Sequence, residues 1–245
     1  MTNPLKGFFY IFTGLTLIFR ADVRRYAFWP FIINVVVVVL LVWYAVEQFD
    51  VWLSWLLSFL PGWLDWLRYI LSPLLALSIL LLLFFSFSMI ASLVSAPFNG
   101  PLSLAVERSL GASKATEEDT DTLVRSSIKA VASELSKISY FLIRAIPIWI
   151  MLIIPGVNVI ASFVWLIFSA WVLCIEFADY PMANHGLEFK AQRQRLQQAR
   201  FQSLGFGFGV NVFAMIPVLN FLLVPAAIAG ASKMWVDNLS NSKKQ

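Results

Sequence analysis

The chain has 245 residues, of which 60% are hydrophobic and only 13% are charged, and its net charge is +4. Soluble domains carry about 25% charged residues, so this composition excludes an ordinary soluble core and predicts an integral membrane protein. The positive balance does not require nucleic acid as a partner, because lysines and arginines that flank membrane helices account for it. A single cysteine, Cys174, excludes an internal disulfide and a thiolate metal cluster.

Residues 1–25 are predicted to form an interfacial helix followed by a basic motif. The apolar stretch Leu5–Phe19 is short and is interrupted by Gly7 and Gly14, which favours a helix lying at the membrane surface over a span. A cleavable signal peptide is not expected, because the first long apolar run starts too late and is too long. Three arginines follow the interfacial stretch: Arg20, Arg24 and Arg25.

Two long spans are predicted, over residues 26–46 and 69–98. The first holds 21 residues without a formal charge, and about 20 are needed for a helix to cross a bilayer. The second lies in an uncharged run of 38 residues, Tyr69–Val106. As one helix this run would be about 57 Å long, which exceeds the hydrocarbon core of about 30 Å. We therefore expect the span either to end at the break Pro97–Pro101 or to project out of the bilayer.

Residues 47–68 separate the two spans and contain four tryptophans: Trp52, Trp55, Trp63 and Trp66. Tryptophan at this density is typical of the lipid headgroup boundary, and Pro61-Gly62 predicts a turn. We therefore expect a short periplasmic hairpin at the membrane interface, whose simplest role is to anchor the chain in lipid.

Residues 99–144 are predicted to form cytoplasmic helices. A polar loop, Gly111–Asp121, carries four acidic residues. After the loop, apolar residues recur at spacings of four and three, which predicts one apolar stripe along a helix: Val124, Ile128, Val131, Leu135, Ile138 and Leu142. Lys137 lies off the stripe, and the helix is expected to pack on a neighbouring helix or on a second subunit.

Residues 145–175 and 201–232 form two similar uncharged segments of 31 and 32 residues. Each has a turn near its middle with the pattern Ile-Pro-x-(Val/Leu)-Asn, which ends at Asn158 in the first segment and at Asn220 in the second. The repeat predicts two hairpin units. A cytoplasmic helix at residues 176–200 is expected between them, and a tail at residues 233–245 after them.

Each hairpin segment could be one long span, two short spans, or a hairpin that enters the membrane and returns. Two arms of about 15 residues fall short of the roughly 20 needed to cross. One long span in each segment would place the four basic residues of 176–200 outside, against the positive-inside bias. The predicted fold class is therefore an all-α integral membrane protein in a single domain. It combines two long transmembrane helices, two half-membrane (re-entrant) helical hairpins and a cytoplasmic helical extension.

The basic motif is the first candidate for a binding site. The start of a helix carries free N–H groups and a partial positive charge, and arginines beside it can complete an anion-binding site. The alternative role for Arg24 and Arg25 is a positive-inside anchor, which is the commoner role of arginines at a membrane boundary.

Charged and titratable residues elsewhere are further candidates. Glu107 and Arg108 follow an apolar run, where ionisable residues are either functional or form an ion-paired structural cap. His185 is the only histidine. It either carries a proton, as in uptake of a solute coupled to protons, or it holds Asp179 or its own loop in place.

Asn158 and Asn220 mark the tips of the two hairpins and are candidates to line a pathway. Cys174 has no histidine close in sequence and is expected to be a packing residue. The sequence has no metal-ligand spacing, phosphate loop or nucleophile elbow, so neither catalysis nor a cofactor or metal is expected.

Several short motifs follow one another in order over nearly the whole chain. They are Gly14-Leu15 and Val23-Arg24-Arg25 with Pro30 and Asn34; Ala96–Gly100; Phe168–Trp171, Asp179–Pro181 and Asn184-His185; and Ile216-Pro217, Asn220, Pro225, Gly230 and Met234–Asp237. Together they resemble the CysZ family of bacterial inner-membrane sulfate permeases. Each motif alone is a weak signal, and their shared order makes the resemblance specific.

The resemblance implies sulfate uptake across the inner membrane to supply cysteine synthesis, and a homo-oligomer. It also implies a sulfate site made by Arg24, Arg25 and the backbone amides near Asp22 and Val23. The family usually has glycine where this chain has Asp22. A carboxylate at a helix N-cap can occupy the N–H groups that an anion would use. Either Asp22 therefore turns outward, or the backbone amides contribute less to the sulfate site in this chain.

We therefore expect a sulfate channel or a proton-coupled sulfate transporter, with sulfate and membrane lipid as its partners and no nucleic acid. One alternative is a transporter of a related oxyanion, such as sulfite or thiosulfate. A second is a non-transporting membrane scaffold that binds partners or lipid through the tryptophan-rich hairpin and the apolar stripe. A third is an intramembrane enzyme that uses Asp179 and His185.

Overall fold

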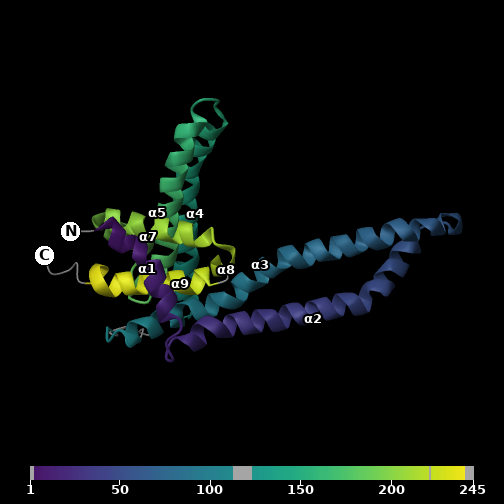
Figure 1. Cartoon of the computed structure of the whole chain (residues 1–245), viewed down its shortest axis with the longest axis horizontal. Coiled ribbons are helices and arrows are strands. Elements are labelled where there is room, and N and C mark those ends of the chain that lie inside the picture. The colour runs from purple at the N-terminus through teal and green to yellow at the C-terminus, as the bar shows by residue number, and fades with distance from the viewer. Residues whose placement is uncertain (1–2, 113–122, 221, 241–245) are drawn as a thin grey trace. The chain divides into compact units, whose positions relative to one another are not determined.

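The protein is described here by a computed structural model over residues 3–112, 123–220 and 222–240, and all regular structure within these ranges is helical. The helices, labelled in Figure 1, are α1 (Pro4–Leu17), α2 (Arg24–Leu57), the 3-10 helix η1 (Gly62–Leu67), α3 (Arg68–Ser109), α4 (Leu123–Ile153), α5 (Asn158–Ala183), α6 (Phe189–Gln198), α7 (Arg200–Ala214), α8 (Pro217–Asn220), α9 (Leu223–Met234) and the π-helical turn η2 (Trp235–Leu239). The prediction of an all-α fold is confirmed for these ranges. The chain divides into two units, residues 26–98 and residues 1–25 with 99–245.

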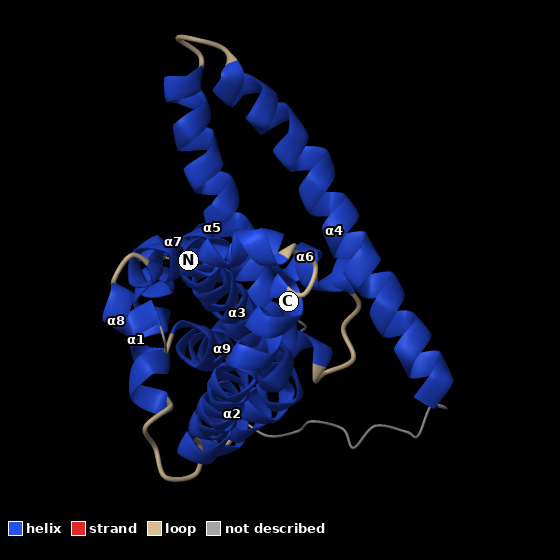
Figure 2. Ribbon diagram, turned by 90° about the vertical axis from the view of Figure 1, so that its right-hand side faces the viewer, coloured by secondary structure: helices blue, strands red, loops and turns tan. Residues whose placement is uncertain are grey.

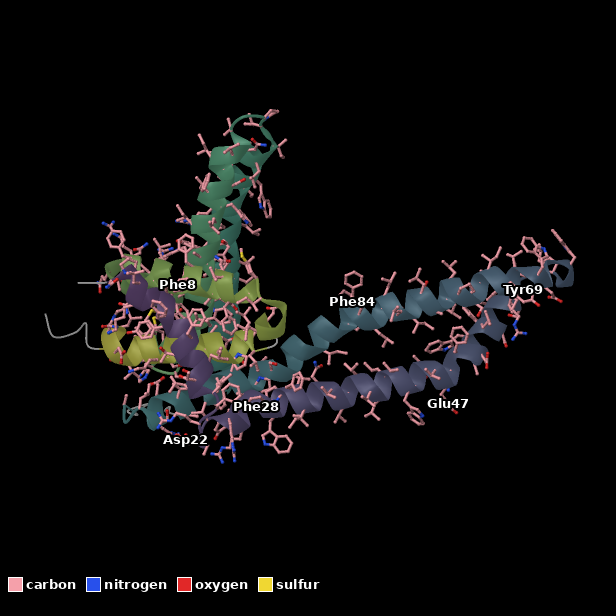
Figure 3. The ribbon with its side chains drawn as sticks, in the orientation of Figure 1. Phe8, Asp22, Phe28, Glu47, Tyr69 and Phe84 are labelled. Carbon is pink, nitrogen blue, oxygen red and sulfur yellow. The ribbon has the colours of Figure 1, made fainter. Side chains whose placement is uncertain are left out.

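The unit of residues 26–98 consists of most of α2 and α3, which run in opposite directions and are joined through η1 (Figure 1). The predicted turn at Pro61-Gly62 is confirmed, because Pro61 has an extended backbone and η1 begins at Gly62. Apolar side chains along both helices are exposed, among them Val39 and Leu82. Phe84, labelled in Figure 3, is another. Such surface is unfavourable in water and favourable in lipid.

Of the two alternatives for the uncharged run Tyr69–Val106, the break at Pro97–Pro101 is wrong, because α3 continues through it to Ser109. A proline inside a helix removes one backbone hydrogen bond and clashes with the carbonyl four residues earlier, at a cost of about 3 kcal/mol. Beyond the prolines, Leu102 and Val106 are buried, and their packing holds the final turns of α3 in helical form.

The unit of residues 1–25 and 99–245 is built around close contacts of α1 with α7 and α9. Glycine makes this approach possible: a Cβ at Gly14 would lie 2.0 Å from the Ala226 carbonyl oxygen, and one at Gly205 would lie 2.0 Å from the Pro4 carbonyl oxygen. Small residues let helix backbones approach in this way in membrane proteins. Gly7 and Gly14 were expected to interrupt a helix at the membrane surface. In the structure they lie where α1 packs against other helices of the same unit.

Helix α7 uses alternate glycines for different neighbours. Gly205 and Gly209 face α1, whereas a Cβ at Gly207 would lie 1.7 Å from the carbonyl oxygen of Ala170 on α5. The sequence Gly-Phe-Gly-Phe-Gly thus seats α7 against α1 and α5 at once, while Phe206 between them is fully buried.

Both predicted hairpin turns are present. Helices α4 and α5 meet at the turn of residues 154–157, where Gly156 has a φ of 84° that favours glycine (Figure 2). Helices α7 and α9 are connected through the short α8.

Four helices in the described residues are long and apolar enough to cross a membrane: Arg24–Leu57, Gly62–Ser86, Leu135–Ile153 and Asn158–Ala183. The last two are the arms of the first hairpin, with 19 and 26 residues. Each arm is longer than the expected length of about 15 residues. The reason is that the two helices continue past Arg144 and Glu176, the charged residues that bound the uncharged segment. The half-membrane depth of the hairpins stays a prediction.

The apolar stripe of residues 124–142 lies on one helix, α4, as expected. The loop residues 113–122 and the side chains of Val124, Ile128 and Val131 lie outside the described residues. Leu135, Ile138 and Leu142 are exposed, whereas Lys137 is buried. The expected packing of this helix on a neighbour is confirmed, because α4 contacts α5 and α6, but the face turned inward carries Lys137 and not these three residues. Packing on a second subunit stays a prediction.

Candidate functional site

A carboxylate–imidazole pair is buried in the unit of residues 1–25 and 99–245. Nε2 of His185 lies 2.7 Å from Oε2 of Glu107, and the Glu107 side chain is 1% exposed. The sequence marks both residues as candidates without relating them. Of the roles expected for His185, that of holding Asp179 is wrong, because His185 pairs with Glu107 and Asp179 pairs with Lys137.

The end of α5 positions His185. The helix ends at Ala183, and Gly186 adopts a φ of 67°, which reverses the chain directly after the histidine. The Leu187 N–H donates to the Met182 carbonyl at 3.1 Å and closes the turn. Trp235 of η2 packs beside the imidazole, with ring centroids 5.3 Å apart. The imidazole is therefore held between Glu107 and an indole ring.

Two serines extend the pair into the core. The Ser103 hydroxyl lies 3.5 Å from Glu107 Oε1 and 2.8 Å from the Ser232 hydroxyl, and both serines are fully buried. Ser232 also donates to the Ile228 carbonyl at 2.8 Å. Sequence reasoning missed both serines. The only available signal was the spacing of four between Ser103 and Glu107, which places them on one helix face.

Burial raises the pKa of Glu107 above its usual value, because the charged carboxylate loses its hydration. The hydrogen bond and charge of His185 and the hydrogen bond of Ser103 oppose this rise. A carboxyl with a raised pKa next to an imidazole can hold a proton and exchange it with its partner.

Two amide hydrogen bonds tie the α3 segment before Glu107 to α5. Asn99 Nδ2 donates to the Tyr180 hydroxyl at 3.0 Å, and Asn184 Nδ2 donates to the Gly100 carbonyl at 3.2 Å. Both asparagines belong to the ordered sequence motifs, Asn99 to Ala96–Gly100 and Asn184 to Asn184-His185. They fix the two backbones from which Glu107 and His185 project.

A buried ion pair joins α4 to α5. Lys137 Nζ contacts Asp179 Oδ2, and the two side chains are 5% and 18% exposed. Gln192 of α6 donates to the other Asp179 oxygen at 2.6 Å. Lys137 was placed off the apolar stripe and given no role. Lys137 faces protein because of the side on which α4 packs against its neighbours. The spacing of the apolar residues did not reveal that side.

The basic motif lies in the turn between α1 and α2 and at the start of α2 (Figure 3). Arg24 and Arg25 are exposed, and Val23 is fully buried. Asp22 is also exposed, and its Oδ1 lies 4.0 Å from Nε of Arg20. The Val23 and Arg24 N–H groups both donate to the Arg20 carbonyl, at 3.1 and 2.8 Å.

The remaining candidates occupy separate places. Arg108 follows Glu107 on α3 and is exposed. Asn158 begins α5 and Asn220 ends α8, so both lie at hairpin turns and both are exposed. Cys174 is fully buried. Within the described part of the chain, no group of three or more histidine, cysteine, aspartate or glutamate side chains could hold a metal ion.

Residues 10–225 match the protein family described as sulfate transporter CysZ/etoposide-induced protein 2.4. The chain belongs to this family. The matched range includes the basic motif, the Glu107–His185 pair and both hairpin turns, and it confirms the resemblance drawn from the ordered motifs. With its four helices long and apolar enough to cross a bilayer, this CysZ/EI24 family chain is a multi-pass membrane protein.

Proposed function

We propose that this chain is a sulfate transporter of the bacterial inner membrane that admits sulfate for cysteine synthesis. The observation that carries the proposal is the exposed pair Arg24 and Arg25 at the start of a membrane helix, in a chain of the CysZ/EI24 family. A guanidinium presents a planar fork of donors that suits tetrahedral oxyanions. Rings of cationic side chains are also what anion pores use for selectivity.

In this proposal the side chains of the motif bind sulfate more than its backbone does. The Val23 and Arg24 amides already donate to the Arg20 carbonyl, so an anion would have to share or replace those bonds. The exposed Asp22 carboxylate lies near the Arg20 guanidinium, which offsets part of its repulsion toward an anion. Sulfate then exchanges its water shell for two guanidinium forks, weakly enough to be released.

The Glu107–His185 pair is proposed to carry the proton in a coupled form of uptake. A buried carboxyl whose pKa is raised can bind a proton at a pH where exposed carboxyls are ionised, and the adjacent imidazole can receive it. Arg108 and the tip residues Asn158 and Asn220 are proposed to line or gate the pathway. A passive channel would leave the pair with a structural role only.

The proposed arrangement in the membrane has α2 and α3 as full spans, and the hairpins α4–α5 and α7–α9 as half-membrane elements. The chains are proposed to assemble as a homo-oligomer in lipid. The positive-inside bias supports an arrangement in which residues 99–144 and 176–200 are cytoplasmic, because nearly all basic residues then face that side.

The decisive test is uptake of labelled sulfate into liposomes that contain the purified protein. The variant with Arg24→Gln and Arg25→Gln should lose uptake by about tenfold or more, since one hydrogen bond to a charged group contributes about 1.5–3 kcal/mol. The matched control, Lys6→Gln with Lys190→Gln, also removes two exposed charges and should transport normally. Uptake by the arginine variant at the native rate would refute the proposal. Repeating the assay with and without a pH gradient separates a coupled transporter from a passive channel.

A second candidate function is a non-transporting membrane protein that binds partners or lipid. This candidate is kept because the family description names two proteins, the sulfate transporter CysZ and etoposide-induced protein 2.4. This candidate predicts that the liposomes take up no sulfate even with the native sequence. If uptake occurs, competition by sulfite and thiosulfate tells whether sulfate or a related oxyanion is the preferred substrate.

A further inference from the structure

An apolar groove with two arginines lies between α4, α5 and α7. Its volume is about 470 Å³. The apolar residues that line it are Ile148, Val164, Ile167, Phe168, Trp171 and Leu204. Arg144 of α4 and Arg200 of α7 complete the lining, and all these residues belong to one unit. The groove therefore combines an apolar wall with two cationic side chains.

The guanidinium of Arg144 is held in place by its own helix. It stacks 3.7 Å from the centroid of the Tyr140 ring, and its Nη1 donates to the Tyr140 carbonyl at 3.2 Å. The Tyr140 hydroxyl in turn accepts a hydrogen bond of 3.1 Å from Nε1 of Trp171, which also lines the groove. The Arg200 guanidinium lies 5.0 Å from the ring of Phe201. A positioned guanidinium loses less freedom when it binds an oxyanion.

The location of the groove selects among possible occupants. Its α4 and α5 walls lie in helix segments that are long and apolar enough to cross a membrane, Leu135–Ile153 and Asn158–Ala183. A small free anion would use the arginines and leave the apolar wall empty. An acyl chain is apolar, as that wall is, and a phosphate group matches the bidentate geometry of guanidinium.

We propose that this groove binds an anionic phospholipid, with its headgroup phosphate at Arg144 and Arg200 and an acyl chain along the apolar wall. Selectivity between lipids comes from the arginines. The lipid tails contribute little to it, because moving a tail from the bilayer into an equally apolar groove changes its free energy little. A lipid with net negative charge is therefore preferred over a zwitterionic lipid of equal chain length. This site is separate from the basic motif, and it does not depend on the proposed transport of sulfate.

The test is native mass spectrometry of the full chain, released from detergent that contains equal amounts of phosphatidylglycerol and phosphatidylcholine with the same chains. The native protein should retain phosphatidylglycerol at least fivefold more than phosphatidylcholine. Arg144→Gln with Arg200→Gln should abolish that preference. The control with Lys6→Gln and Lys190→Gln removes two charges outside the groove and should keep it. Val164→Trp fills the apolar wall and should reduce retention of both lipids.

Three outcomes would overturn the proposal. The first is equal retention of the two lipids by the native chain, or an unchanged preference in the arginine variant with native helical content by circular dichroism. The second is displacement of the lipid by millimolar inorganic phosphate, which would make the groove a free-anion site. The third is a lipid-free dimer that Val164→Trp converts to monomers, which would make the groove a contact between copies of this chain.

Discussion

At the scale of single residues, the pairing of Glu107 with His185 is the main result. Each was a candidate for its own reasons, one as a charge after an apolar run and the other as the only histidine. At 2.7 Å they form one hydrogen-bonded pair. The surroundings are a serine pair and an indole ring, so water has little access to the carboxylate.

The raised pKa of Glu107 gives a dependence of stability on pH with a definite sign. The folded state holds the proton more tightly than the unfolded chain does, so the contribution to the free energy of unfolding is complete below the unfolded pKa. It is lost as the pH rises from the unfolded to the folded pKa. We expect Glu107→Gln to remove this loss, so the difference between variant and native thermal midpoints in detergent should grow from pH 4.5 upward. The measurement is thermal unfolding at a series of pH values.

His185 provides the matched variant for this experiment. His185→Ala removes the hydrogen bond and charge that lower the Glu107 pKa, so the loss of stability should extend to higher pH than in the native chain. Parallel curves for the native protein and Glu107→Gln would contradict the assignment, since the carboxyl would then titrate alike in the folded and unfolded states.

At the scale of elements, backbone contact through glycine sets the spacing of the helices. Helix α7 lies against α1 and α5 at distances that leave no room for a Cβ, and the same holds for α1 against α9. In lipid, such close packing replaces the hydrophobic drive that assembles helices in water. The site depends on this spacing, because Ser232 of α9 and His185 after α5 are carried by the packed helices.

The tightest of these contacts gives a prediction for the pair α5–α7. Gly207→Ala would place a methyl carbon 1.7 Å from the Ala170 carbonyl oxygen, so the helices must move apart. We expect a loss of about 1–3 kcal/mol, as for other overpacked positions. Thermal unfolding in detergent measures it.

Gly100→Ala is the control for this prediction, because Gly100 is also inside a helix and the nearest atom to its Cβ is 3.6 Å away. Alanine there should be neutral or stabilising by up to about 1 kcal/mol. Equal midpoints for the two variants would mean that α5 and α7 are not held at the spacing described.

At the scale of the whole molecule, family membership and four long apolar helices define a multi-pass membrane protein. The arms of the first hairpin are long enough to cross, with 19 and 26 residues. A crossing hairpin and a half-membrane hairpin leave both ends on the same side of the membrane, so they differ only in the depth of the tip.

Labelling of single cysteines by a membrane-impermeant reagent from the outer side tests this topology. Cysteine at Asp65 should be labelled, because η1 is predicted to be periplasmic. Cysteine at Lys190 should not be labelled, because α6 is predicted to be cytoplasmic. The half-membrane prediction adds that cysteine at Asn158 reacts poorly from outside. The native Cys174 is fully buried and should contribute little background.

Two outcomes would revise the topology. Strong labelling at Asn158 with none at Lys190 would make α4 and α5 a full pair of spans. Strong labelling at Lys190 would reverse the side assigned to residues 176–200.

The sequence by itself determined the membrane class, the helical structure of the described ranges, both hairpin turns and the family. These follow from local chemistry: the length of uncharged runs, proline and glycine at turns, and motifs in a fixed order. It failed at Pro97–Pro101, where packing of Leu102 and Val106 outweighs the preference of proline for a helix end.

Only the tertiary structure decided which distant residues meet. Glu107 and His185 are 78 positions apart, and Lys137 and Asp179 are 42 apart. Neither separation carries a periodic signal, because such pairs depend on which face each helix turns inward. A charge buried without a partner is costly, and this cost favours the packing in which each of these charged side chains meets its partner.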